Sequence, residues 1–178
     1  MRRLALIAAL WAVPGFAQDG PSSVVAPAGL LEYGVICDVD IEGQQPAPDT
    51  ESGSLNIIGE AEEVDVVTRL VPAELGLTFG VRLGMQEGAV PLAGRVVVEH
   101  PPLGASGVTR ESWAAELLPG GALVSLYSFE AAHELVTGRW IFRFEAGDEV
   151  LSEQHFDVVD AAAVPAVMDA CFDGVPIS

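Results

Sequence analysis

Apolar and polar residues alternate in short runs along most of this chain, and glycine, proline and aspartate interrupt the runs at regular intervals. Such alternation is typical of β-strands, in which successive side chains point to opposite faces of a sheet. No long segment before the C-terminal region keeps the 3.6-residue apolar period of an amphipathic helix. The pattern predicts strands over residues 32–41, 53–58, 63–71, 77–83, 95–100, 111–117, 123–129, 138–145 and 149–159.

The last two predicted strands give the clearest local structure. Because side chains alternate from face to face along a strand, three aromatic residues fall on one face of the first one, namely Trp140, Phe142 and Phe144. Residues 146–148 (AGD) supply a turn between the two strands. We expect the aromatic face of this hairpin to lie in the core.

The regular spacing of short strands predicts an all-β fold, an antiparallel immunoglobulin-like β-sandwich. After the last strand, Asp160 can cap a short helical segment that has Pro165 in its first turn and extends to Cys171. We therefore expect one β-sandwich domain over residues 30–178, closed by this short helical segment.

The first seventeen residues have the pattern of a secretory signal peptide. Arg2 and Arg3 precede an apolar run, and small residues follow as far as Ala17, where we expect cleavage. The apolar run has about ten residues, fewer than the roughly twenty that a membrane span needs. Residues 18–29 are small, polar and proline-containing, which predicts a flexible lead-in. The chain is thus predicted to be a soluble periplasmic or secreted protein.

The chain is strongly acidic, with 26 aspartates and glutamates against eight arginines, no lysine and a formal net charge of −18. Nucleic acids and anionic lipid surfaces are unsuitable partners, because binding to them depends on lysines and arginines that neutralise phosphates. Solubility of an exported protein is the simplest explanation of the acidity. A calcium-rich surface and an acidic face for a basic partner are the sharper alternatives.

The sequence contains two cysteines, Cys37 and Cys171, one near each end of the predicted domain. An isolated pair in an oxidising compartment is normally a disulfide. A redox or metal-binding pair would be expected at C-x-x-C spacing, which these residues do not have. We predict a structural Cys37–Cys171 bridge.

Several segments in combination carry a resemblance to a known family: residues 32–37 (EYGVIC), 71–76 (VPAELG), 79–81 (FGV), 100–102 (HPP), 112–113 (SW) and 134–140 (ELVTGRW). The chain resembles a family of short exported bacterial proteins that is described as a domain of unknown function. The resemblance extends from about residue 30 to residue 171. It implies an all-β domain, and it implies no activity and no functional residue.

Two groups of acidic residues are candidate calcium ligands, because clustered carboxylates supply the oxygen atoms that calcium binds. Asp38, Asp40 and Glu42 alternate, which would place all three on one face of a strand. The second group leads into the next predicted strand and consists of Glu60, Glu62, Glu63 and Asp65. The chain has no EF-hand loop pattern, and an ordinary solvated acidic surface is the favoured explanation of both groups.

The sequence contains no recognisable catalytic motif and predicts no cofactor. Residues 104–107 (GASG) lack the spacing of a nucleophile turn. The three histidines, at positions 100, 133 and 155, lack zinc-ligand spacing and are predicted at strand ends or on polar faces. A hydrolase with a dispersed catalytic site stays an alternative, and it requires a histidine hydrogen-bonded to a serine or cysteine.

The favoured function is a non-enzymatic interaction domain of the bacterial envelope that binds a protein partner. Sandwiches present binding surfaces through loops and exposed strands, so we expect recognition at a sheet edge or around residues 100–110. The candidate surface comprises His100, Arg110 and Trp113, although a core position is favoured for Trp113 because large aromatic residues dominate sandwich interiors. The first alternative is a calcium-binding envelope module, which calcium should stabilise against heat.

Overall fold

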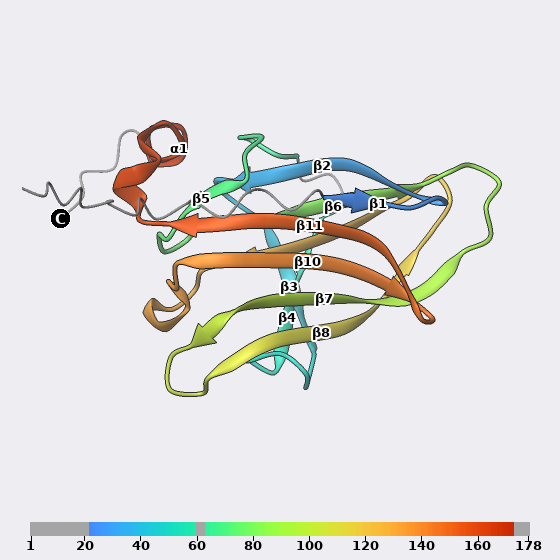
Figure 1. Ribbon diagram of the computed structural model, residues 1–178, viewed down its shortest axis with the longest axis horizontal. Coiled ribbons are helices and arrows are strands. Elements are labelled where there is room, and N and C mark those ends of the chain that lie inside the picture. Colours follow the sequence, from blue (N-terminus) through green and yellow to red (C-terminus); the bar gives the residue numbers. More distant parts are fainter. Residues whose placement is uncertain (1–21, 60–62, 173–178) are drawn as a thin grey trace, which may run out of the picture.

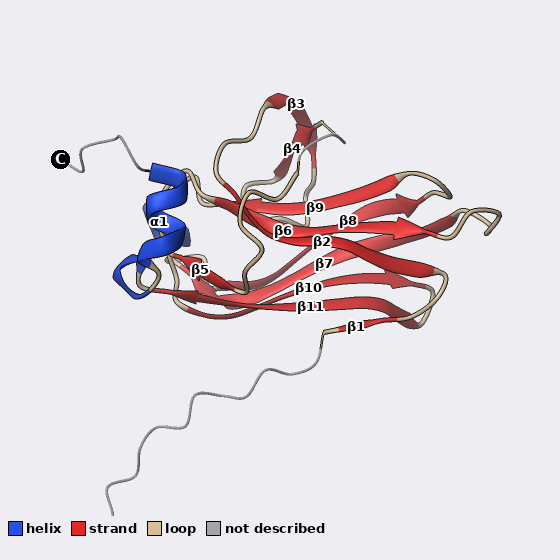
Figure 2. Cartoon of the chain, turned by 90° about the horizontal axis from the view of Figure 1, so that it is seen from above, coloured by secondary structure: helices blue, strands red, loops and turns tan. Residues whose placement is uncertain are grey.

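The computed structural model describes residues 22–59 and 63–172, which form two β-sheets packed face to face (Figures 1 and 2). The larger sheet has the strand order β1 (Ser23–Val24), β11 (Glu149–Val159), β10 (Gly138–Ala146), β7 (Leu92–Leu103) and β8 (Val108–Leu117). A short strand, β5 (Leu70–Pro72), pairs in parallel with β11. The smaller sheet has the order β2 (Ala28–Ile36), β6 (Thr78–Met85) and β9 (Ala122–Ser128).

Two further elements lie outside this sandwich. A two-stranded ribbon of β3 (Ile41–Pro46) and β4 (Ser54–Ile58) stands beyond β9 (Figure 2). The helical turns η1 (Ala132–Glu134) and η2 (Ala161–Ala163) precede β10 and the C-terminal helix α1 (Pro165–Phe172), respectively. The predicted all-β antiparallel sandwich with a short C-terminal helical segment is confirmed, with the β5–β11 pair as its parallel exception.

The core is built on aromatic rings from both sheets. The ring of Phe79, on β6, lies 5.3–5.5 Å from the rings of Phe129, Trp140, Phe142 and Phe156. Trp140, Phe142 and Phe144 of β10 are all essentially inaccessible to solvent, and Trp140 is opposite Phe156 in the β10–β11 register. The predicted hairpin and the burial of its aromatic face are confirmed.

Two predicted strands are wrong. The strand predicted over 32–41 is two strands, because the chain bends at Cys37 before β3 begins. Most of the strand predicted over 63–71 is irregular, since Val66 contacts β2 through a single bridge to Val35 and only β5 is a strand. The segment therefore touches the sandwich at Val66, but it does not form a continuous ladder of hydrogen bonds with a neighbouring strand before β5.

The predicted flexible lead-in over 18–29 is also wrong at its C-terminal end. β1 pairs with β11, and Ala28 begins β2 with its side chain buried. β7 is longer than predicted and runs through residue 103. His100 is therefore a buried residue within a strand, and the prediction that it lies at a strand end or on a polar face is wrong.

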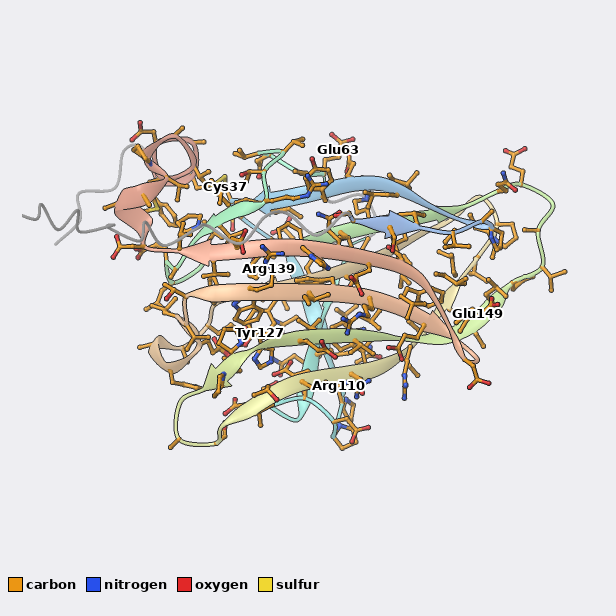
Figure 3. The ribbon with its side chains drawn as sticks, in the orientation of Figure 1. Cys37, Glu63, Arg110, Tyr127, Arg139 and Glu149 are labelled. Carbon is orange, nitrogen blue, oxygen red and sulfur yellow. A yellow bond between two sulfur atoms is a disulfide. The ribbon has the colours of Figure 1, made fainter. Side chains whose placement is uncertain are left out.

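The predicted disulfide is confirmed. Cys37 follows β2 and Cys171 lies in the last turn of α1, and the bridge brings their Cα atoms to 4.8 Å across a sequence separation of 134 residues (Figure 3). Asp160 caps η2 by accepting a hydrogen bond from the Ala162 N–H at 2.9 Å, and Pro165 begins α1. The bridge thus fastens the C-terminal segment to the smaller sheet.

The predicted signal peptide and its cleavage site at Ala17 lie outside the described residues. Within residues 22–59 and 63–172, no helix has the length and apolar character of a membrane span.

We predict that the double variant Cys37→Ala/Cys171→Ala loses about 5 kcal/mol of unfolding free energy, because an unbridged unfolded chain regains the entropy of a long loop. Guanidinium denaturation of the variant and of the oxidised wild type measures this difference. The wild type under reducing conditions is the control and should match the variant. A loss below about 1 kcal/mol would contradict a stabilising role for the bridge.

We further predict that Phe79→Ala costs about 3–5 kcal/mol, because it removes a ring that is completely buried among aromatic neighbours. Val90→Ala is the control, since that side chain is 77% exposed and should change stability very little. Thermal and chemical unfolding of both variants test the prediction. Similar stability of the two variants would show that Phe79 is not central to the core.

Candidate functional site

A cavity of about 370 Å³ lies between the β3–β4 ribbon and the neighbouring edges of β8 and β9. The ribbon contributes its β4 residues 54–58, and β9 contributes residues from both of its faces. Trp113 and Tyr127 supply aromatic surface. Four glutamates line this acidic pocket, and no lysine or arginine is among its lining residues: Glu51, Glu111, Glu130 and Glu134.

Hydrogen bonds connect the ribbon with the sandwich. The Glu51 N–H donates to Glu111 Oε1 at 3.1 Å, and the side-chain amide of Asn56 donates to Glu130 Oε1 at 2.6 Å. The Ser112 N–H of β8 donates to the carbonyl of Asp49 at 3.1 Å. β3 itself is exposed over nearly its whole length.

His100 lies beneath the pocket with its side chain completely buried. Its ring packs on Trp140, with 4.6 Å between ring centroids. Nδ1 is 2.9 Å from the Pro101 carbonyl, and a carbonyl can only accept, so Nδ1 carries the proton. Nε2 lies 3.9 Å from Glu111 Oε1 and has no hydrogen-bond partner. Burial lowers the pKa of His100, and the Pro101 carbonyl partly opposes that shift.

Glu111 points from β8 towards the same region and is buried. Burial raises the pKa of its carboxyl group, and the negative charges of Glu134 and Glu51 raise it further. The hydrogen bond from the Glu51 N–H acts in the opposite direction. A carboxylate in this position is therefore costly to ionise.

Glu134 and Tyr127 form the adjoining wall. Glu134 Oε2 accepts hydrogen bonds from the N–H groups of Glu130 and Ala131 at 2.6 and 2.8 Å. Burial and the charges of Glu134 and Glu111 raise the pKa of Tyr127 far above its ordinary value, and its hydrogen bond to Glu134 adds to this. Tyr127 is consequently a permanent hydrogen-bond donor to a buried carboxylate.

His133 is not among the lining residues of the pocket, and its side chain is 43% exposed. Its Nε2 atom is 3.4 Å from Glu51 Oε1. One ligand atom from each of Glu51, His133 and Glu134 lies within 4.8 Å of the other two. In the described part of the chain, this is the one group of three or more such residues that could surround a metal ion.

Residues 24–158 match the family described as a domain of unknown function, DUF3859. The chain belongs to the DUF3859 family. The resemblance carried by its sequence segments is thus confirmed for the family, which covers most of the sandwich. Comparison with curated proteins gives no match.

One solved structure similar to this DUF3859 chain is an immunoglobulin-like protein from Pseudomonas aeruginosa. The two are 27% identical, the similarity covers 80% of this chain and 100% of that one, and the TM-score is 0.47.

In the DUF3859 fold, the three residues of the predicted binding surface do not lie together. Trp113 lines the pocket while also packing against the core, and His100 lies behind it. Arg110 lies on the outer face of the larger sheet, where its guanidinium is 3.9 Å from Glu99 (Figure 3). The sequence does not reveal Glu51, Glu111, Tyr127 and Glu134 as site residues, because no local spacing connects residues that meet only through packing.

The calcium candidates do not share one strand face, so that prediction is wrong for the first group. Asp38 and Asp40 lie in the connection between β2 and β3, and Glu42 alone is in a strand. The second group consists of Glu60 and Glu62, which lie outside the described residues, and of Glu63 and Asp65. Asp65 Oδ2 accepts a hydrogen bond from the Cys37 N–H at 2.8 Å and so helps to shape the backbone near the disulfide.

The three histidines have carbonyl, carboxylate and guanidinium partners in residues 22–59 and 63–172. His155 Nε2 is 2.6 Å from Glu153 Oε1, and its Nδ1 is 3.1 Å from the guanidinium of Arg139. His100 and His133 face a carbonyl and carboxylates, as described above. None of the three is hydrogen-bonded to a serine or cysteine there, which is the geometry that the hydrolase alternative requires.

We predict that Glu111→Gln raises the melting temperature at pH 8, because it removes a buried charge next to two other glutamates and keeps an oxygen for the Glu51 N–H. With a raised folded-state pKa, the cost of ionising Glu111 is present above that pKa and absent below the ordinary value of 4.5. The gain should therefore shrink as the pH falls towards 4.5.

Thermal unfolding from pH 4 to 8 in EDTA measures this effect, since EDTA removes cations that would compensate the charge. Glu116→Gln, at an exposed position of the same strand, is the control and should change the melting temperature little. A Glu111→Gln variant with no gain at pH 8 would contradict the prediction.

Proposed function

We propose that this DUF3859 chain is an exported, non-enzymatic binding domain that takes a positively charged group of a protein partner into the acidic pocket. The observation that carries the proposal is a cavity lined by four glutamates and by no lysine or arginine. A cleft with charges of one sign and low-dielectric walls concentrates ions of the opposite sign. A lysine or arginine side chain of a partner has the matching charge.

The aromatic residues of the pocket support the same proposal. Trp113 and Tyr127 offer ring surface beside the carboxylates. A guanidinium or ammonium group can bind carboxylates with its charged end while its aliphatic stem covers aromatic rings. A long basic side chain can therefore use both the aromatic rings and the carboxylates of the pocket.

The compartment is part of the proposal. A confirmed disulfide favours an oxidising environment, where such bridges persist. The N-terminal signal-peptide pattern and the strongly acidic composition are in keeping with export. We therefore propose the periplasm or the extracellular medium as the place where the partner is met.

Affinity co-purification from an envelope extract of the host tests the proposal, with tagged wild type and two variants of equal net charge. Glu111→Gln/Glu130→Gln removes two pocket charges, and Glu116→Gln/Glu149→Gln removes two exposed charges from strand positions outside the pocket lining. A partner retained by the wild type and the control, and lost from the pocket variant, is the expected result.

With the purified partner, calorimetry should give an affinity that is about tenfold or more weaker for the pocket variant, as for loss of a charged hot-spot contact. The affinity of the wild type should fall as salt is added, because salt screens attraction between charges. Equal binding by the pocket variant and the control would overturn the proposal.

A further inference from the structure

We infer that the side of the acidic pocket formed by Glu51 and Glu134 binds one divalent transition-metal ion, held by the carboxylates of these two residues and the imidazole of His133. The site shares the pocket of the proposed partner but goes beyond that function, because a metal ion can bind without a partner. Its three ligands come from the turn between β3 and β4 and from η1.

The spacing of the ligand atoms suits one small ion. Ligands at about 2.0–2.2 Å from a tetrahedral zinc ion are about 3.3–3.6 Å from one another. His133 Nε2 and Glu51 Oε1 are 3.4 Å apart, and the ligand atoms of all three residues lie within 4.8 Å. Small side-chain movements would be enough to close the three atoms around the ion.

The charge of this region calls for a cation. Glu51, Glu111 and Glu134 approach one another, and Glu111 and Glu134 are buried. Among the described residues, no arginine forms an ion pair with any of the three. The basic groups within 4.0 Å of their carboxylates there are the imidazoles of His100 and His133, and His100 carries its proton on Nδ1, away from Glu111. Buried carboxylates are normally paired with cations or coordinate metal ions.

His100 gives a second and independent indication. Its Nδ1 proton is directed at the Pro101 carbonyl, so Nε2 presents a lone pair. This completely buried atom has no hydrogen-bond partner and faces the Glu111 carboxylate at 3.9 Å. The region around Glu111 therefore has more hydrogen-bond acceptors than donors, as expected where a positive ion binds.

The ligands are also held in orientation before any ion arrives. Two backbone N–H groups and the Tyr127 hydroxyl fix the Glu134 carboxylate. The hydrogen bond from the Glu51 N–H to Glu111 fixes the backbone that carries the second ligand. Metal-binding carboxylates are characteristically held by such outer hydrogen bonds.

The donor set selects the class of ion. An imidazole nitrogen with carboxylate oxygens suits zinc and neighbouring transition metals, whereas calcium and magnesium prefer oxygen ligands alone. The half-exposed ring of His133 gives the ion a route from solvent to the buried glutamates.

Isothermal titration of Zn²⁺ into the metal-stripped, partner-free mature protein tests the inference. We expect one ion per chain and an affinity that drops about 100-fold in His133→Ala and at least tenfold in Glu51→Gln. His155→Gln and Glu149→Gln are the matched controls, since both residues lie outside the site, and their affinities should equal that of the wild type. Circular dichroism verifies that each variant is folded.

Co²⁺ provides a readout that does not depend on affinity. Its visible absorption should indicate a site of low coordination number in the wild type and should change in His133→Ala. Absence of Zn²⁺ binding, unchanged binding in His133→Ala, or tighter binding of Ca²⁺ than of Zn²⁺ would each overturn the inference.

The two proposals fail separately. The titration contains no partner, so a negative result removes the metal site alone. The co-purification with Glu111→Gln/Glu130→Gln is performed in EDTA as well as in Zn²⁺. If that variant and its control recover the partner equally under both conditions, the partner-binding proposal alone is overturned.

Discussion

The indole ring of Trp140 connects the hydrophobic core with the polar pocket, and the arrangement of both depends on its position. It contacts the core rings of Phe79 and Phe129 at 5.5 and 5.8 Å. It also contacts His100 and Tyr127, which lie at the pocket, at 4.6 and 4.7 Å. Because protein interiors are close-packed, these contacts leave the two polar side chains little freedom. The floor of the acidic pocket is therefore as rigid as the core beneath it.

The opposite wall of the pocket has a different physical character. In the β3–β4 ribbon, β3 is exposed over nearly its whole length, and a few hydrogen bonds to Glu111, Glu130 and Ser112 connect the ribbon with the sandwich. Regions with few buried apolar contacts open at a lower free-energy cost than the core does. A rigid floor with a lightly attached wall is suited to admitting a ligand without disturbing the sheets.

The acidic pocket costs stability in the absence of a positive ligand. Burial and neighbouring carboxylates both disfavour the ionised form of Glu111, and nearby Tyr127 stays protonated for the same reasons. Local arrangements that cost stability are characteristic of functional sites, where a ligand recovers the cost on binding. The DUF3859 chain thus combines an aromatic core and a long-range disulfide with one region that a cation would stabilise.

The sequence by itself determined the all-β class, the aromatic hairpin of β10 and β11 and the Cys37–Cys171 bridge. These features depend on local alternation or on the presence of only two cysteines, so they can be read without knowing the fold. Only the tertiary structure decided that Val66 contacts β2 at a single bridge and that β7 continues through His100. It also decided which of the 26 acidic residues converge. Glu51, Glu111 and Glu134 are far apart in the chain and meet because two sheets and a ribbon pack together. The periodicity of apolar and polar residues within one segment carries no information about such long-range contacts.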